Sequence, residues 1–516
     1  MRAAVETQQA VTDHNADVPA DRRIVLRIGI NLGDVVIDGD DIQGDGVNLA
    51  ARLKSMAAPG GICVSGMVYE GVRDRIDVPF EDLGEQEIKN FDRPVRVWQW
   101  VADTAAATVL RQTDNPLPLP DKPSIAVLPF DNMSGDPDQD SFAEGLTEDL
   151  ITDLSKVSGL FVVARNSSFA YKGRPTEIRA VAAELGVRYV LEGSVRKSGA
   201  RVRINAQLID AETGGHIWAD RYDGSVENAF ELQDEVGAKV VSALSVRLTR
   251  REAENLKRVH TRNLEAYELF VSARATPYPP IPERITTARK MFERVIEMDP
   301  DFAGGYAGVS AMLSFGAMWS HGDNSEVITR AFDMAEKAVL VDDTFGWGHM
   351  ALGWALLFRR QYGDAIAAAR EAITRQPNDA DAHAYHGFFL GLDGQDSLGV
   401  EALNKAIRLN PRFFNGPYLN MLAANQMLAG NYGASIECYL ENESRRGPFG
   451  PPAFCWAVAA FVGLARQQEA ADLTALLRQR FPKFIMTGWN YFSLIRDDAV
   501  RDRVKDLMRT AGVPED

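Results

Sequence analysis

The residues best suited to chemistry are an aspartate, an asparagine and an arginine near the start of the chain. Asp41 precedes Asn48 by seven residues, and Arg52 follows Asn48 by four. Because residues four apart share a face of a helix, the Asn48 amide and the Arg52 guanidinium would project together. The amide can hold a ribose or phosphate oxygen, and the guanidinium can stabilise charge that builds on phosphates. On spacing alone, such a helix face beside an acidic loop is more often a solvated surface.

The surrounding residues predict an α/β unit that holds this pair. Residues 23–42 alternate in polarity and carry β-branched residues, which predicts two strands joined through a turn at 31–34. Residues 44–57 predict a helix with an apolar face, stopped by a Pro-Gly-Gly sequence. The remaining elements expected in this unit are a helix over 1–20, a strand at 62–65, a helix at 67–76 and a strand at 94–100.

The order of these segments resembles the second half of class III nucleotidyl cyclases over about residues 23–100. A strand, an Asp-x6-Asn-x3-Arg segment, Pro-Gly-Gly-Ile and Ile-Lys-Asn-Phe follow one another as they do in that family. The resemblance implies a partial, ferredoxin-like α/β domain. It implies that Asp41 reads the purine, Asn48 orients the ribose and Arg52 stabilises the transition state at the phosphates. Lys89 would contact phosphate, and a structural role for Lys89 is equally open.

The sequence departs from the family at the metal-binding carboxylates. The family domain begins with a strand bearing one metal-binding Asp, followed by a hairpin bearing a second, and nothing before residue 23 could supply them. Mg²⁺ or Mn²⁺ is therefore expected for the family, with its ligands absent from this chain. Asp34, Asp38 and Asp45 are expected to serve as turn and capping residues.

Family sites form between two subunits, so the resemblance implies a second cyclase chain as partner. A homodimer of this chain would contain no complete site. Three explanations remain open: a truncated gene model, which the abrupt start favours, a subunit that pairs with a complete cyclase, and a decayed regulatory remnant.

A second α/β domain is predicted at 123–225, after a proline-rich linker at 103–122 and before a single connecting helix at 226–261. Its segments Ser-Ile-Ala-Val-Leu-Pro-Phe and Tyr-Val-Leu-Glu-Gly-Ser-Val-Arg resemble the TolB N-terminal-like domain, which implies a fold and no established chemistry. Its polar residues are expected to be structural: Asn132, Ser134 and Asp136 as loop caps, and His216 and Trp218 as packing residues.

Residues 262–516 predict an all-α repeat domain. Pro377 and Pro411 are 34 residues apart, as are Gly353 and Gly387, and this period resembles tetratricopeptide repeats. Stacked helix pairs would form a concave groove for a peptide or protein partner. The two histidines three apart, at 383 and 386, lack a carboxylate or cysteine companion, so no metal site is expected there.

The composition excludes several classes of partner. The chain has 516 residues and a formal charge of −16, which argues against nucleic acid and against anionic lipid as partners. Three dispersed cysteines, Cys63, Cys438 and Cys455, are expected to be buried small hydrophobes. The N-terminus has no signal-peptide pattern, and no apolar run is long enough to span a membrane, which predicts a cytoplasmic protein.

The sequence therefore predicts a signalling protein of the adenylate cyclase family, which converts ATP into cyclic AMP and pyrophosphate. It is expected to be inactive alone, with the TolB-like and repeat domains regulating it through protein binding. The alternative is a non-catalytic repeat scaffold with a degenerate cyclase-like dimerisation domain.

Overall fold

The chain forms two compact units, Met1–Asn115 and Pro116–Asp516. The structure is a computed structural model. It describes residues 3–5, 7–8, 10–11, 26–33, 36–38, 41–57, 60–72, 80–86, 94–101, 117–134, 136, 139–173, 177–199, 201–225, 229–256, 260–274, 282–414, 416–445, 447 and 449–515.

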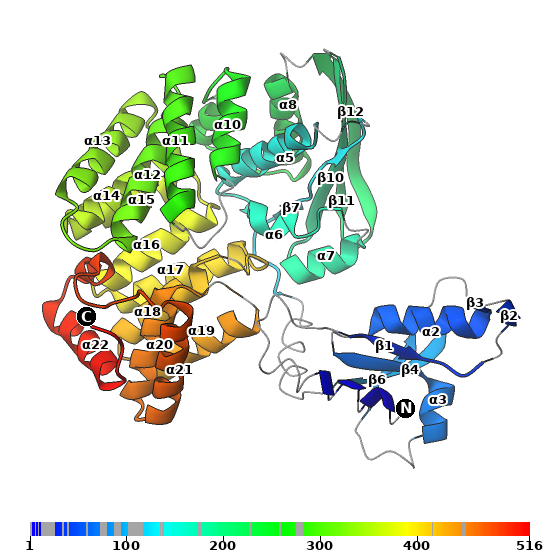
Figure 1. The fold of residues 1–516 in the computed structure, drawn as a ribbon. Coiled ribbons are helices and arrows are strands. Elements are labelled where there is room, and N and C mark those ends of the chain that lie inside the picture. The colour runs from blue at the N-terminus through cyan, green and yellow to red at the C-terminus, as the bar shows by residue number, and fades with distance from the viewer. Residues whose placement is uncertain are drawn as a thin grey trace. The chain divides into compact units, whose positions relative to one another are not determined.

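The N-terminal unit contains a four-stranded sheet in the order β1-β4-β6-β5 (Figure 1). Strand β1 pairs with β4 in parallel, and β6 pairs with β4 and β5 in antiparallel fashion. A separate antiparallel hairpin joins β2 to β3. The elements are β1 (Ile28–Ile30), β2 (Val36–Asp38), β3 (Asp41–Gln43), α2 (Asp45–Met56), β4 (Gly61–Ser65), α3 (Gly66–Val72), β5 (Glu81–Gln86) and β6 (Val95–Val101).

Two features of this unit differ from the sequence-based expectation. Residues 23–42 were expected to form two strands, whereas β1, β2 and the start of β3 all fall within them. Strand β5 was not predicted, because Glu-Asp-Leu-Gly-Glu-Gln has little intrinsic preference for a strand. Pairing with β6 holds it in place, and the Arg96 Nε donates to Asp82 Oδ2 at 3.1 Å across the two strands.

Helix α2 lies very close to strand β1, and a glycine makes this approach possible. A Cβ atom at Gly29 would lie 2.2 Å from both the Ala50 carbonyl oxygen and the Lys54 backbone nitrogen of α2. Backbone atoms of a packed helix cannot give way as a flexible side chain can. Gly29 therefore sets the distance between the sheet and the helix that carries Asn48 and Arg52.

We predict that Gly29→Ala destabilises the N-terminal unit by about 3 kcal/mol, because the added methyl overlaps α2. Gly71→Ala is the matched control, since nothing lies within 4 Å of a Cβ atom at this helical position. Urea unfolding followed by circular dichroism measures both. Equal stability of the two variants would contradict the close approach.

The C-terminal unit begins with an α/β domain whose main sheet has the order β12-β11-β10-β7-β9, with β8 also paired to β10. Helices α5 and α8 pack together against the sheet through a core that includes Leu150, Leu154, Val236 and Val240. The predicted succession of strands and helices is present, with β8 and α6 in addition. The elements are β7 (Ser124–Val127), β8 (Asp131–Asn132), α5 (Asp140–Ser155), β9 (Phe161–Val162), α6 (Arg165–Phe169), α7 (Ile178–Leu185), β10 (Tyr189–Ser198), β11 (Arg201–Asp210), β12 (Gly215–Ser225) and α8 (Ala229–Ala243).

The prediction of a single connecting helix at 226–261 is wrong, because the described residues there form two helices. Helix α8 ends at Ala243 and α9 (Arg250–Leu256) begins seven residues later, with Ser245 at a positive φ of 53° between them. The sequence contains a signal for this break, because Thr249 and Glu252 have the spacing of a capping box at the start of a helix. The Glu252 side chain accepts from the Thr249 backbone N–H at 2.7 Å, and Thr249 Oγ1 accepts from the Glu252 N–H at 3.2 Å.

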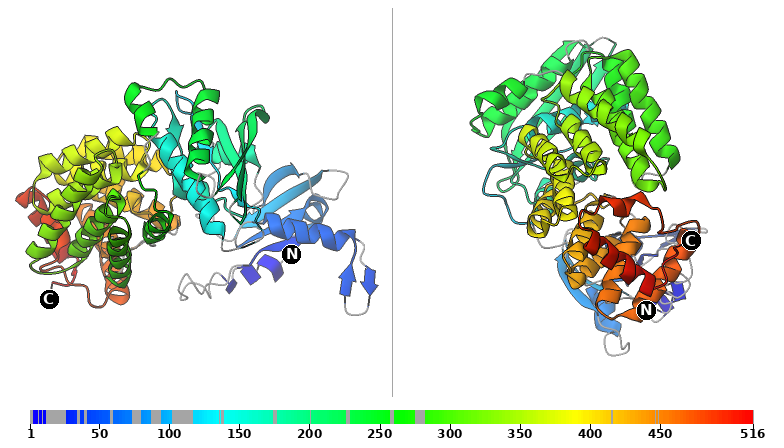
Figure 2. Two further views of the ribbon diagram at one scale, coloured as in Figure 1. Left: turned by 90° about the horizontal axis from the view of Figure 1, so that it is seen from above. Right: turned by 90° about the vertical axis from the view of Figure 1, so that its left-hand side faces the viewer.

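The remaining residues form a solenoid of antiparallel helix pairs, which confirms the predicted tetratricopeptide-type repeats (Figure 2). The described helices are α10 (Leu264–Arg274), α11 (Pro282–Met298), α12 (Ala303–Trp319), α13 (Ser325–Val341), α14 (Gly346–Phe358), α15 (Tyr362–Arg375), α16 (Ala380–Leu392), α17 (Asp396–Leu409), α18 (Tyr418–Leu428), α19 (Tyr432–Ser444), α20 (Pro451–Gly463), α21 (Gln467–Arg480), η4 (Asn490–Leu494) and α22 (Asp498–Thr510).

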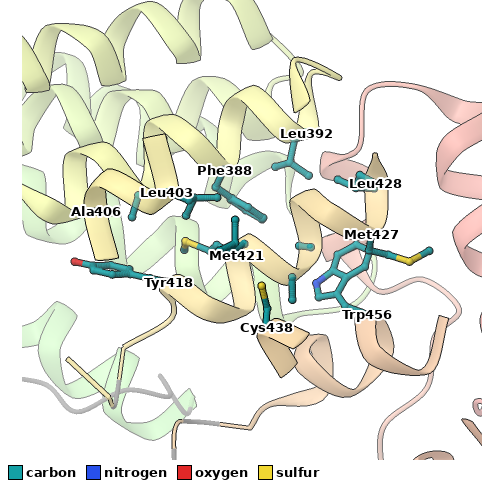
Figure 3. Close-up of a cluster of buried hydrophobic side chains, with 14 of the residues drawn as sticks. Phe388, Leu392, Leu403, Ala406, Tyr418, Met421, Met427, Leu428, Cys438 and Trp456 are labelled. Carbon is teal, nitrogen blue, oxygen red and sulfur yellow. The ribbon is translucent and has the colours of Figure 1, made fainter. Parts of the chain in front are cut away.

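Small residues allow the helices of a pair to touch. At Gly387 a Cβ atom would lie 2.7 Å from the Gly399 carbonyl oxygen of the paired helix, so only glycine fits. Large side chains from successive helices then fill the space between pairs, as with Phe388, Met421 and Trp456 (Figure 3). All three cysteines are buried, as predicted.

The α/β domain and the repeats are joined through backbone groups. Arg408 of α17 donates to the carbonyl oxygens of Leu185 at 3.0 Å and Gly186 at 2.7 Å, which end helix α7. It also donates to the Pro118 carbonyl at 2.8 Å and lies over the Phe161 ring. Since the last carbonyls of a helix have no partner within it, one guanidinium here satisfies groups that would otherwise need water.

We predict that Arg408→Ala costs about 1.5–3 kcal/mol, because it removes three charge-assisted hydrogen bonds to backbone carbonyls, two of them partly buried. Amide hydrogen exchange should rise in α7 and in residues 117–120. Arg466→Ala is the control, since the side chain of this exposed arginine pairs with Glu469 and lies over the Phe461 ring, both within the repeats. Unchanged exchange in α7 would show that Arg408 does not hold the domain.

Candidate functional site

Helix α2 is held at its start by the loop that follows β1. Gly44 precedes the helix with φ 131°, and its carbonyl accepts from the backbone N–H of Asn48 at 3.0 Å. The Asn31 side chain donates to the Gly46 carbonyl at 3.2 Å. The start of α2 is thereby tied to the end of β1, which fixes where the helix presents its side chains. Sequence reasoning placed Asn31 in a turn and missed this tie.

Asn48 and Arg52 lie on the exposed side of α2. Leu49 and Leu53, the next residue after each, are buried in the core together with Cys63. Because the apolar side faces the sheet, the amide and the guanidinium are both directed to solvent. Among the described residues, Arg52 forms no ion pair with a carboxylate.

The structure describes less of the other predicted site residues. Asp41 begins strand β3, directly before α2, and its backbone pairs with Asp38; its side chain lies outside the described part. Lys89 and Asp34 also lie outside the described residues. The structure thus brings Asn48 and Arg52 together, and the roles assigned to all four residues stay predictions.

The described residues do not form a metal site. No three His, Cys, Asp or Glu side chains within them lie close enough to share an ion. The side chains of Asp34, Asp38 and Asp41, which precede the asparagine and arginine pair in the sequence, are outside the described part, and the metal ligands of the family stay a prediction.

Neither the cysteines nor the paired histidines have the character of a catalytic group. Burial raises the pKa of the Cys63 thiol to about 11, so it stays protonated and is a poor nucleophile. Burial lowers the pKa of His383 and of His386 to about 4, so both are neutral at pH 7. The His383 ring donates from Nε2 to the Pro377 carbonyl at 2.9 Å, which holds a repeat turn.

The polar loop of the α/β domain is structural, as expected. Asn132 accepts from the Ser134 backbone N–H at 2.9 Å and donates to Asp140 Oδ1 at 2.8 Å. Trp218 is half-buried and lies against Tyr222. His216 is exposed, so its predicted packing is wrong: it lies on the edge strand β12, which is paired on one side only.

None of the helices in the described part of the chain has both the length and the apolarity to cross a membrane.

Comparison with known proteins identifies the N-terminal segment. Residues 2–101 match the family model of the adenylate and guanylate cyclase catalytic domain. Over 368 residues the chain is 48% identical to a protein of Rhizobium meliloti (strain 1021) named "Putative adenylate cyclase 3". The match covers 71% of this chain and 62% of that protein, so the chain spans less than two thirds of its relative.

Two solved structures are similar to segments of the chain. An adenylate/guanylate cyclase/hydrolase from Silicibacter pomeroyi is 52% identical, with a TM-score of 0.19, over 20% of this chain and 61% of its own. PilW, a type IV pilus biogenesis factor, is 17% identical with a TM-score of 0.33, over 46% of this chain and 96% of its own.

The segment expected to resemble TolB matches a differently named family. Residues 121–239 match the second domain of HilA/YgeH-like transcriptional regulators. The match includes β7 to β12 and most of α8. The TolB-like assignment therefore stays a prediction.

Proposed function

We propose that this chain, whose residues 2–101 belong to the adenylate and guanylate cyclase catalytic domain family, supplies one half of an adenylate cyclase site. The observation that carries the proposal is the exposed pair Asn48 and Arg52 on α2, anchored by a buried apolar side. The site is completed by a second cyclase chain, which contributes the metal-binding carboxylates. The reaction converts ATP into cyclic AMP and pyrophosphate.

The chemistry assigned to these residues follows from their charge and exposure. The ribose 3′-oxygen forms a bond to the α-phosphorus, its proton is lost, and the bond to the pyrophosphate oxygen breaks. Arg52 stabilises the negative charge that grows on the phosphates, and Asn48 orients the ribose. Asp41 reads the adenine, and Lys89 contacts phosphate. Carboxylates of the second cyclase chain would hold Mg²⁺ or Mn²⁺, which would supply positive charge at the phosphates.

The C-terminal unit, in this proposal, regulates the cyclase half in the cytoplasm through protein or peptide binding. The stacked helix pairs provide a surface of the kind that such partners use. The α/β domain, in which we expect a TolB-like fold, is joined to the repeats through Arg408. In this proposal, a partner that binds the repeats changes the position of the α/β domain through this contact. A non-catalytic scaffold with a degenerate cyclase-like dimerisation domain is the second candidate.

We predict that the purified chain alone forms no cyclic AMP from ATP with Mn²⁺, because its half of the site holds no metal. A radiolabelled-ATP assay measures this directly. Sustained turnover above the rate of a protein-free control would contradict the assignment of the metal ligands to a partner.

We predict that the chain restores activity to a complete cyclase whose own Asn and Arg equivalents have been replaced. Arg52→Ala should then lower the rescued rate by about 10²–10³, because a donor to the developing charge is lost. Lys54→Ala is the matched control, since it removes an exposed cation from the same helix.

The two candidate functions separate in this assay. The half-site proposal is supported if the parent chain restores activity, Arg52→Ala abolishes this rescue and Lys54→Ala preserves it. No rescue by a chain that still forms a complex with the cyclase supports the scaffold.

A further inference from the structure

A cavity of about 510 Å³ lies within the C-terminal unit, where helices α5 and α6 meet the repeats. The repeat helices α10, α12, α14, α16, α18 and α20, with parts of α11 and η4 and the loops between helices, contribute the rest of its wall. Pockets of about 300–1,000 Å³ are the size that holds a small molecule. The α/β domain thus occupies part of the surface that was expected to form an open peptide groove.

The hydrogen bonds that join the α/β domain to the repeats beside the cavity are buried. The Asn378 side chain donates to the Val157 carbonyl at 3.0 Å, at the end of α5. The Asn410 side chain accepts from both the backbone N–H and the hydroxyl of Ser167 in α6, at 3.1 and 2.7 Å. Since these groups are satisfied by one another, the wall made by α5 and α6 is part of the folded unit.

Charged side chains of both signs border the cavity. Glu148 of α5 is 7% exposed and forms ion pairs with Arg165 at 2.8 Å and with Arg274 at 3.5 Å. Two further carboxylates, Asp379 and Asp381, lie at the start of α16. Three carboxylates therefore border the cavity together with two guanidinium groups, which leaves an excess of negative charge.

Among the carboxylates that border the cavity, Asp379 is held by backbone hydrogen bonds, and no described cation forms an ion pair with it. Its Oδ1 accepts from the Ala382 backbone N–H at 3.0 Å and caps α16. Asp381 instead accepts from the Tyr418 hydroxyl at 2.5 Å. Burial, together with the neighbouring Asp381, raises the pKa of Asp379 to about 6. An added cation would relieve this unfavourable environment.

Aromatic rings border the same space. Trp354 is 2% exposed and packs edge-to-face with Tyr385, with ring centres 5.3 Å apart, and beside Phe388. Its indole N–H has no acceptor among the described residues. Arg274 already lies over the face of Trp347 at 5.3 Å, which shows that a cation is accommodated beside these rings.

We propose that this cavity binds a small organic cation, with an ammonium or guanidinium group at Asp379 and an apolar body against Trp354, Tyr385 and Phe388. The size of the cavity, its excess negative charge and its aromatic wall all point to this ligand chemistry. Because the wall joins the α/β domain to the repeats, binding would tighten the junction between them. The proposal is independent of the cyclase assignment of the N-terminal unit.

The test uses the full chain and three probes that share one body and differ in charge: 4-phenylbutylamine, 4-phenylbutanol and 4-phenylbutyrate. Thermal unfolding and tryptophan fluorescence report binding, since several tryptophans line the cavity. We expect the amine to bind at least tenfold more tightly than the alcohol or the acid. Equal binding of the three, preference for the acid, or no binding of the amine at 1 mM would overturn the proposal.

Two capping aspartates provide a matched pair of variants. Asp379→Asn keeps a residue that caps helices well and removes the charge, so the amine should bind at least tenfold more weakly. Asp497→Asn makes the same change at the cap of α22, outside the cavity, and should leave binding unchanged. Thr152→Trp should abolish binding by filling the cavity from α5. Equal affinity of the two Asn variants would also overturn the proposal.

The pH dependence gives a further readout. The charged groups that act most strongly on Asp379 are Asp381 on its own helix and Arg274 on α10. As the pH falls through about 6, Asp379 becomes protonated and loses its charge. Amine affinity should therefore weaken from pH 7.5 to pH 5.5 in the parent chain and stay constant in Asp379→Asn. The same pH dependence in both would assign the binding to another group.

Discussion

The hydrogen bonding of backbone groups between the α/β domain and the repeats is the constraint on which the C-terminal unit depends. Arg408 satisfies the carbonyls at the end of α7, and Asn410 and Asn378 satisfy groups of α6 and α5. Buried backbone groups without partners are costly, so these side chains leave few alternative positions for the domain. The cavity is the space left between the α/β domain and the repeats when they dock.

The N-terminal unit depends on a different constraint, the close contact between a strand and a helix. Gly29 brings β1 against the backbone of α2, and Leu53 is buried beneath the helix. The opposite side of the same helix then presents Asn48 and Arg52. The packing that stabilises the unit is thus also what exposes the pair assigned to the nucleotide.

Much of the architecture could be predicted from local patterns. The 34-residue spacing of Gly353 and Gly387 identified the helix pairs, since only small residues fit where paired helices touch. The capping box at Thr249 and Glu252 was also present in the sequence, but residues 244–249 contain neither Gly nor Pro to mark the break between the two helices. Strand β5 had no local signal, because its pairing with β6 decides its conformation.

The sequence by itself determined the apolar faces of the helices, the repeat period and the placing of Asn48 and Arg52 four residues apart. The tertiary structure alone decided that Asn410 meets Ser167, 243 residues away, and that Asp379 and Trp354 border one cavity. The physical reason is that periodicity and capping act over a few residues. Contacts across hundreds of residues depend on where folded surfaces meet, and they leave no repeating pattern in the chain.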